Sequence, residues 1–279
     1  MDIGGWLFAV FLLAGLVSLI LVLQDRFIYF PARYSPAQLQ ASKMAGVHEV
    51  KFRTSQGNQT AFFWRNEDAA RAPQNLWLVF GGNGDVALAW MELIRPFAVA
   101  QTGYLLIDYP GYGICEGRPN PQTILENSER ALQTLLEKKA WNRGADAIGV
   151  FGHSLGGAAA LQFAARNRVR KIVLVSTFTT MDEMVQRQIR FPLGHLLQHR
   201  FDNVGCLKSI LSQNPVPEIC IFHGTIDEII PSKMGQALAQ LDPGRIHYCE
   251  IPGAGHNEII QMPLPEKLHS AFFGPLAPD

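Results

Sequence analysis

Hydrophobic and polar positions follow two periods along most of this chain. Short runs rich in β-branched and aromatic residues predict β-strands, and the later runs are almost continuously apolar, as in strands buried on both faces of a sheet. The predicted strands cover residues 47–54, 60–65, 75–80, 104–108, 147–151, 171–176, 218–222 and 246–251.

Helical patterns alternate with these strands from residue 75 onward. The clearest helix covers 121–140, which begins with a proline and carries apolar residues at helical spacing. Continuous apolar strands separated by amphipathic helices predict a mostly parallel central sheet with helices on both faces. The first two strands, joined by the sequence SQGNQ, predict instead an antiparallel hairpin at one edge.

The N-terminal residues 3–23 show neither the strand nor the helix pattern of polar and apolar positions. Residues 3–23 carry no charged side chain, and as a helix they would cross the ~30 Å hydrocarbon core of a bilayer. Aromatic residues and two arginines alternate within 26–34, as is typical of a membrane interface. A cleaved signal peptide is the alternative, but Asp2 precedes the run without any basic residue, and no small-residue cleavage site follows it. We therefore predict an N-terminal transmembrane helix.

This interpretation divides the chain into three parts. We predict that residues 1–24 are a membrane anchor, 25–45 a juxtamembrane linker, and 46–279 one globular domain, large enough for a single core. Basic residues lie only on the C-terminal side of the span, which predicts a single-pass membrane protein with its catalytic domain facing the cytoplasm.

Composition and charge narrow the class of function. The chain of 279 residues is 48% hydrophobic and carries 24 basic and 24 acidic side chains, which indicates a globular protein without a nucleic-acid partner. Its four cysteines show no disulfide-scaffold or metal-ligand spacing, and Cys220 and Cys249 lie in strand-like runs that predict buried free thiols. We expect no metal and no cofactor.

One glycine-rich turn carries a candidate nucleophile. In the stretch GVFGHSLGG, at 149–157, Ser154 follows an apolar strand and precedes a small-residue helix. Gly152 and Gly156 leave room for the strained turn called a nucleophile elbow, which exposes the serine hydroxyl at the end of the sheet. A simple turn serine is the alternative.

A nucleophilic serine needs a base and a group that orients the base. In this strand–turn–helix context the expected order is serine, acid, histidine. Asp227 follows the strand at 218–222, and His256 follows the last strand. Asp182 is the rival acid, whereas Glu228 is expected to point elsewhere. His153 and His223 are expected to shape their turns.

Two backbone N–H groups are expected to stabilise the oxyanion of an acyl-transfer reaction. One is that of Leu155, after the nucleophile, and the other is that of Asn83 in the loop GGNG. That loop lacks the residues of a P-loop or a dinucleotide fingerprint, so a phosphate-binding role is disfavoured.

Several stretches, in order, carry a family resemblance. They are DRFIYFPARY, FGGNGD, IDYPGYGICEGRPN, GVFGHSLGG, RFDN, HGTIDEIIP and GAGHNE. With them the chain resembles serine hydrolases of the α/β-hydrolase superfamily, and more narrowly the membrane-anchored branch that includes protein depalmitoylases and uncharacterised bacterial relatives. The resemblance implies the α/β-hydrolase fold, the triad Ser154, Asp227 and His256, and the oxyanion residues Asn83 and Leu155.

The chain departs from that family pattern at two places. Gly81 stands where relatives usually have a histidine, and Ile114 with Cys115 where they often have Lys-Ser. Neither departure removes a triad residue. Cys115 as a modification site is the minor alternative to a structural role.

The segment at about 178–217 replaces a simple helical crossover. Its apolar residues predict a small cap over an acyl-binding groove, although packing on the sheet is an equal alternative. We predict hydrolysis of carboxylic esters or thioesters with apolar acyl chains, from a lipid or an acylated protein. A peptidase or lysophospholipase with the same triad, and a non-catalytic membrane-anchored scaffold, are the other hypotheses. The apolar residues of the predicted cap at about 178–217 are Phe178, Met181, Met184, Phe191, Leu193, Leu196 and Leu197.

Overall fold

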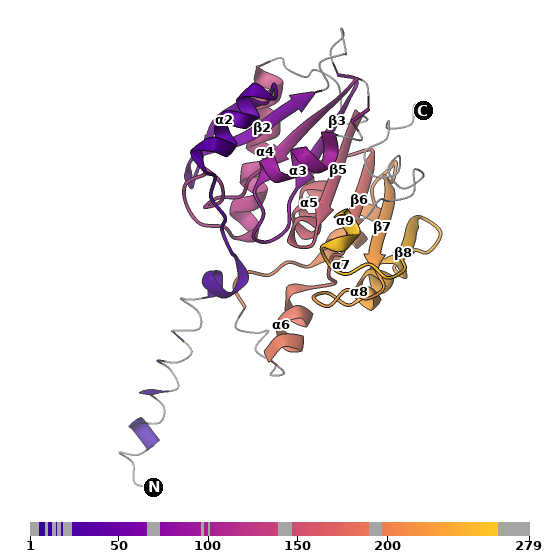
Figure 1. The fold of residues 1–279 in the computed structure, drawn as a ribbon. Helices are drawn as coiled ribbons and strands as arrows, with labels where there is room; N and C mark the ends of the chain where they lie inside the picture. The colour runs from indigo at the N-terminus through magenta and orange to yellow at the C-terminus, as the bar shows by residue number, and fades with distance from the viewer. Residues whose placement is uncertain are drawn as a thin grey trace.

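A computed structural model shows one eight-stranded sheet between two layers of helices (Figure 1). It describes residues 6–8, 11, 12, 15, 18, 24–65, 73–95, 98, 99, 101–138, 147–189 and 197–261. The strand order is β1-β2-β4-β3-β5-β6-β7-β8. The strands are β1 (His48–Thr54), β2 (Gly57–Arg65), β3 (Asn75–Phe80), β4 (Thr102–Ile107), β5 (Ile148–His153), β6 (Lys171–Val175), β7 (Glu218–Gly224) and β8 (Ile246–Ile251).

The directions of the strands determine which strands end at the same edge of the sheet. β1 pairs antiparallel with β2, and β2 antiparallel with β4, whereas the pairs from β4 through β3 to β8 are parallel. The predicted parallel sheet and its antiparallel edge hairpin are therefore confirmed. Parallel neighbours end at the same edge, so the loops after β3 to β8 meet there.

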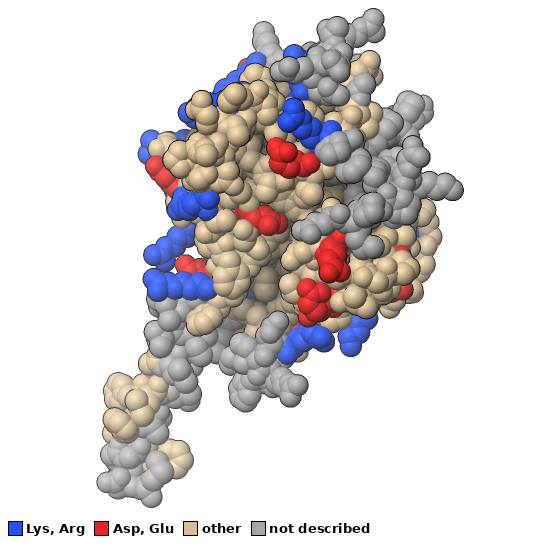
Figure 2. All heavy atoms as spheres, in the orientation of Figure 1, with Lys and Arg blue, Asp and Glu red and all other residues tan. Residues whose placement is uncertain are grey.

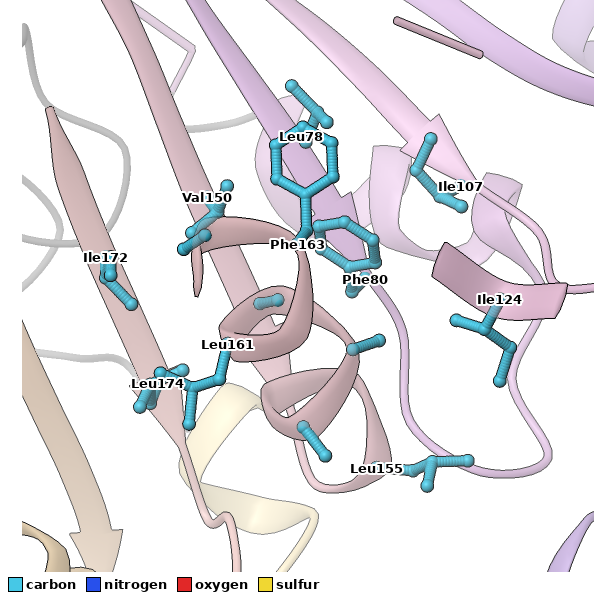
Figure 3. Close-up of a cluster of buried hydrophobic side chains, with 14 of the residues drawn as sticks. Leu78, Phe80, Ile107, Ile124, Val150, Leu155, Leu161, Phe163, Ile172 and Leu174 are labelled. Atoms are coloured by element: carbon cyan, nitrogen blue, oxygen red, sulfur yellow. The ribbon is translucent and has the colours of Figure 1, made fainter. Parts of the chain in front are cut away.

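Two separate cores cover the two faces of the sheet, because successive side chains of a strand point to opposite faces. Leu78 and Phe80 of β3 belong to one core, together with Phe163 of helix α5 (Leu155–Arg166) (Figure 3). Trp77 and Val79, at the alternate positions, belong to the other. The helices are α2 (Pro36–Met44), α3 (Ala87–Ile94), α4 (Pro121–Glu137), α5 (Leu155–Arg166), α6 (Met181–Ile189), α7 (Asn203–Leu211), α8 (Ser232–Ala239) and α9 (Glu258–Gln261).

Local sequence signals account for where these elements begin. The side chain of Asn120 accepts a hydrogen bond from Thr123 N–H at 2.8 Å and Pro121 is the first helical residue, so α4 begins at the predicted proline. β2 begins at Gly57, three residues before the predicted start. Thr54 pairs with Gly57, so only two residues of the predicted SQGNQ connection form the turn.

The predicted membrane anchor, residues 1–24, falls mostly outside the described residues. In the part of the chain that is described, no helix is long and apolar enough to cross a membrane. The anchor remains a prediction. All four cysteines are free. Cys220 is buried, as predicted, whereas the prediction of burial is wrong for Cys249, which is partly exposed.

α5 packs unusually close to the strands beneath it. A Cβ atom on Gly156 would overlap with the carbonyl oxygen of Phe80, and one on Gly152 would overlap with the carbonyl oxygen of Gly156. Both clashes are with backbone, which cannot rotate away. The sharp entry into α5 therefore depends on two positions without side chains.

Gly156→Ala tests this close approach. Because the added methyl meets backbone atoms, we expect a destabilisation of at least about 3 kcal/mol, which for a chain of this size lowers Tm by roughly 6–12 °C. Gly244→Ala is the matched control, since its nearest neighbour would be the Asp242 side chain at 3.5 Å. Thermal unfolding followed by circular dichroism measures both, and equal Tm values would contradict the close approach.

Candidate active site

Ser154 occupies a strained turn between β5 and α5. Its φ and ψ are 55° and −120°, a conformation that costs a non-glycine residue about 1–3 kcal/mol. Hydrogen bonds to neighbouring strand ends hold the turn. Ser154 N–H donates to Val175 O at 2.9 Å, and the Thr177 hydroxyl donates to Ser154 O at 3.0 Å. The serine is thus presented at the carboxyl edge of the sheet, as the sequence predicts for a nucleophile elbow.

The predicted base and acid lie beside this serine. His256 Nε2 is 3.0 Å from Ser154 Oγ, and His256 Nδ1 is 2.8 Å from Asp227 Oδ2. Because a carboxylate can only accept, Nδ1 carries the proton and Nε2 is left to accept from the serine hydroxyl. His256 is 3% exposed. The three residues come from three loops, and this geometry is that of a Ser-His-Asp relay.

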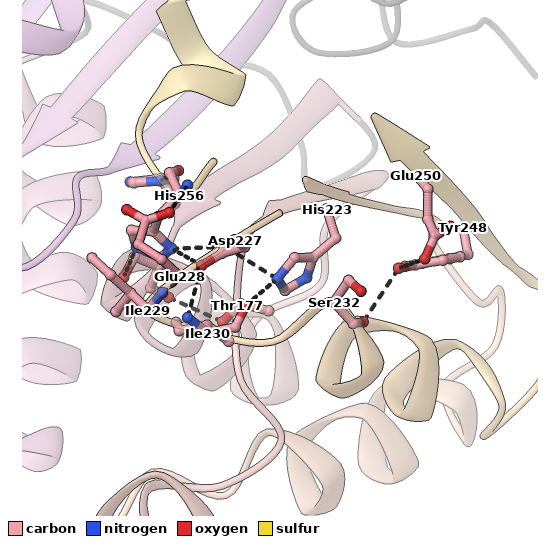
Figure 4. Close-up of polar contacts among 12 residues, drawn as sticks. Thr177, His223, Asp227, Glu228, Ile229, Ile230, Ser232, Tyr248, Glu250 and His256 are labelled. Atoms are coloured by element: carbon pink, nitrogen blue, oxygen red, sulfur yellow. Dashed lines mark hydrogen bonds and ion pairs between the residues drawn. The ribbon is translucent and has the colours of Figure 1, made fainter. Parts of the chain in front are cut away.

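Asp227 is held by four donors (Figure 4). Ile229 N–H and Ile230 N–H donate to Oδ1 at 3.0 and 2.7 Å. His223 Nε2 lies 3.2 Å from Oδ2, and His256 donates from the other side. Burial raises the pKa of the Asp227 carboxyl, but the hydrogen bonds from His223, His256 and Ile230 outweigh it and hold the pKa well below its usual range. The acid is therefore ionised at neutral pH.

Glu228 and His153 support His256 through its backbone. His256 N–H donates to Glu228 Oε2 at 3.1 Å, so the expectation that Glu228 points elsewhere is wrong. The His256 carbonyl oxygen lies 3.1 Å from His153 Nε2, which must carry a proton to bond with it. Burial, together with the nearby His256, lowers the pKa of His153 to about 4. This neutral ring adds no positive charge beside the candidate base.

His223 does more than shape its turn. Its ring contacts Asp227, four residues later, and its Nε2 also lies 2.8 Å from Ile230 O. The sequence feature that could have indicated this contact is the position of His223 four residues before Asp227, in HGTID.

The rival acid, Asp182, lies on α6, and its Oδ1 has no hydrogen-bond partner among the described residues. Since Asp227 binds His256, Asp227 is the acid of this arrangement.

The two predicted oxyanion residues lie on adjacent strand ends. Leu155 is the first residue of α5, so its N–H has no acceptor within that helix. Asn83 lies in the loop after β3, and β3 pairs directly with β5. The first turn of α5 packs on the start of that loop, since a Cβ on Gly156 would also meet the carbonyl oxygen of Gly81. Asn83 and Leu155 therefore belong to loops in contact.

The side chain of Asn83 has a role that the sequence did not indicate. Its Nδ2 donates to Ile28 O at 2.6 Å, and its Oδ1 accepts from Phe30 N–H at 3.0 Å and from the Tyr112 hydroxyl at 2.7 Å. The predicted oxyanion loop is thus fastened to the segment that follows the predicted anchor. A motif search cannot detect a contact between residues that lie more than 50 positions apart in the sequence.

Metal binding finds no support among the described residues. There, no three His, Cys, Asp or Glu side chains are grouped so that they could hold a metal ion. The predicted mechanism without cofactor remains a prediction, and the residues that surround Ser154 are those of proton transfer.

Known proteins share the fold of this chain. The family described as "alpha/beta hydrolase fold" matches residues 76–204. An esterase from Pyrococcus furiosus superposes with a TM-score of 0.63 at 14% identity, covering 88% of this chain and 94% of its own. The chain has the α/β-hydrolase fold. The esterase domain of a Rhodothermus marinus protein has a TM-score of 0.58 at 17% identity, over 83% of this chain and 100% of that domain.

Two curated relatives extend the match in sequence. An uncharacterised protein of Mycobacterium tuberculosis strain H37Rv is 27% identical over 248 residues, 88% of this chain and 84% of the relative. Uncharacterised protein YfhR of Salmonella typhi is 26% identical over 189 residues, 64% of this chain and 62% of its own. Both relatives are described as uncharacterised, so they assign no reaction to this chain.

Asp227→Asn tests the assignment of the acid. The amide still accepts from the two backbone N–H groups but presents an NH₂ to His256, which favours the wrong tautomer and should slow labelling of Ser154 by a fluorophosphonate about 10⁴-fold. Asp182→Asn is the control and should label at the wild-type rate. The rates are compared by gel fluorescence, and the reverse ranking of the two variants would make Asp182 the acid.

Asn83→Ala tests the fastening of the oxyanion loop. The change removes three hydrogen bonds but keeps the backbone N–H, so we expect the maximal labelling rate to fall about 10- to 100-fold through misplacement of that donor. The probe concentration that gives half of the maximal labelling rate should change little. Asn167→Ala, which removes an amide bonded to Glu129 and Phe163 far from the site, is the control. A wild-type rate in Asn83→Ala would show that the loop holds its position unaided.

Proposed function

We propose that this α/β-hydrolase-fold protein is a serine hydrolase that cleaves carboxylic esters or thioesters through an acyl-enzyme on Ser154. The observation that carries the proposal is the unbroken relay from Ser154 Oγ through His256 to the buried Asp227 carboxylate, with distances of 3.0 and 2.8 Å. The structural similarity to two proteins whose titles name them esterases or esterase domains supports the same class of reaction.

The groups of the site fit each step of such a reaction. His256 Nε2 accepts the Ser154 proton as the hydroxyl oxygen attacks the acyl carbon, and Asp227 stabilises the imidazolium that results. The N–H groups of Leu155 and Asn83 receive the negative oxygen. The imidazolium then protonates the departing alcohol or thiol. Water, deprotonated by His256, releases the carboxylic acid and restores the serine.

An apolar acyl group suits the side chains around this edge. Ile226 and Ile229, on either side of Asp227, are 62% and 41% exposed. The predicted cap contributes less: Phe178, Met181 and Leu197 are buried in the main core, which favours packing on the sheet for these three. Met184 is partly buried there too. The other cap residues named above, 191, 193 and 196, lie outside the described residues.

Membrane attachment is part of the proposal. The uncharged run at 3–23 supports a single-pass anchor, and the basic residues that follow it favour a catalytic domain on the cytoplasmic side, near lipids or acylated proteins. The described residues of this run include exposed aromatic side chains such as Trp6 and Phe11. A membrane-anchored depalmitoylase-like hydrolase is the narrowest form of the proposal.

A chain-length series tests the function. Detergent-solubilised protein is assayed with p-nitrophenyl esters and acyl thioesters from acetyl to palmitoyl, beside Ser154→Ala. We expect kcat/KM to rise from acetyl to medium or long chains, because each buried methylene contributes up to ~0.8 kcal/mol, and turnover to vanish in the variant. A preference for acetyl would refute the apolar acyl specificity. If the folded wild type hydrolyses nothing, the scaffold hypothesis replaces the enzyme.

A further inference from the structure

A hollow lies beside the segment that follows the predicted anchor. It has a volume of about 360 Å³ and is formed between residues 25–33 and the loop at 111–119. Arg26 and Arg33 come from the first wall and Arg118 from the second. Asp25 is its one acidic lining residue, so positive charge is in excess. None of these residues belongs to the triad or to its hydrogen-bond network.

The arginines are arranged to hold an anion. Arg33 Nη1 donates to Gly113 O and Cys115 O, at 3.3 Å each, which fixes its side chain against the loop at 111–119. Arg118 lies 3.6 Å from the Asp25 carboxylate, and its side chain is 79% exposed. A carboxylate thus already sits against one guanidinium here. The planar guanidinium group also suits the oxygens of a phosphate.

The surroundings favour a lipid as the source of that phosphate. Phe27 and Phe30, beside Arg26, are 75% and 60% exposed. Exposed aromatic rings next to basic side chains are typical of the headgroup region of a membrane. Figure 2 shows basic side chains gathered, with an acidic one among them, on the flank where the N-terminal segment leaves the domain.

We propose that this hollow binds the phosphate of an anionic phospholipid headgroup. Arg118 exchanges its contact with Asp25 for the lipid phosphate, Arg26 and Arg33 complete the charge, and Phe27 and Phe30 lie among the upper parts of the acyl chains. The bound lipid bridges the two walls of the hollow, one of which continues into the predicted anchor.

Thermal unfolding of the full chain with defined ligands tests the site. The protein is held in neutral dodecyl maltoside micelles, and dihexanoyl phosphatidylglycerol, dihexanoyl phosphatidylcholine or inorganic phosphate is added while tryptophan fluorescence is recorded. Because a ligand that binds only the folded state raises Tm, we expect phosphatidylglycerol to raise it in a saturable way and phosphatidylcholine to have little effect. An equal rise with inorganic phosphate would overturn the lipid source and leave a free-phosphate site.

Two variants and a control link the shift to the hollow. R118Q should weaken phosphatidylglycerol binding about tenfold, the effect of one lost charge-assisted hydrogen bond, whereas D25N should strengthen it by removing the competing carboxylate. R166Q, another exposed arginine paired with a carboxylate, at 3.7 Å from Glu129, should bind as wild type does. Equal binding by R118Q and R166Q would overturn the proposal. The readout needs no catalysis, so the proposed hydrolase function stands or falls separately.

Discussion

The contact between the first turn of α5 and the end of β3 sets the geometry of everything above it. Without side chains at Gly152 and Gly156, the helix begins one residue after Ser154 and lies directly on the backbone of the neighbouring loop. The serine is forced into its strained conformation by that short connection. The same contact brings the N–H of Leu155 beside the Asn83 loop. Strain of about 1–3 kcal/mol at one residue is small against the two cores that enclose the turn.

Charge in the site follows from how its buried groups are paired. Burial raises the pKa of the Asp227 carboxyl, but four hydrogen-bond donors lower it by more and keep the acid ionised. An ionised acid fixes the tautomer of His256 and leaves Nε2 facing the serine. His153 stays neutral behind that ring, and its pKa of about 4 shows the cost of a second buried cation there. The Asp227 carboxylate therefore holds a negative charge beside His256, and this charge stabilises the imidazolium that forms when His256 takes up a proton.

The sequence predicted the parts of the site that depend on chain order, and it missed those that depend on side-chain direction. Apolar periodicity located the parallel strands, and the loops after them supplied Ser154, Asp227 and His256, which the structure brings within hydrogen-bond distance. Glu228 was misplaced because the direction of a loop side chain depends on the turn at Ile229 and Ile230, which periodicity cannot predict. The start of β2 was also set by pairing, since Gly57 joins the strand only through its partner Thr54.

The segment at 25–34 couples the predicted anchor to the proposed chemistry. Tyr29 is buried against the ring of His199, with ring centroids 5.4 Å apart, and Gln24 accepts from Gln198 N–H at 2.8 Å. Through Phe30 and Ile28 the same segment holds Asn83, whose third partner, Tyr112, lies in the loop at 111–119, and other residues of that loop line the arginine-lined hollow.

A displacement of the segment that follows the predicted anchor would therefore reach the predicted oxyanion loop through the hydrogen bonds of Ile28 and Phe30 to Asn83, without passing through the sheet. A lipid that joins the two walls of the hollow would hold those bonds in place, so the affinity of the hollow and the reactivity of Ser154 should be coupled through Asn83.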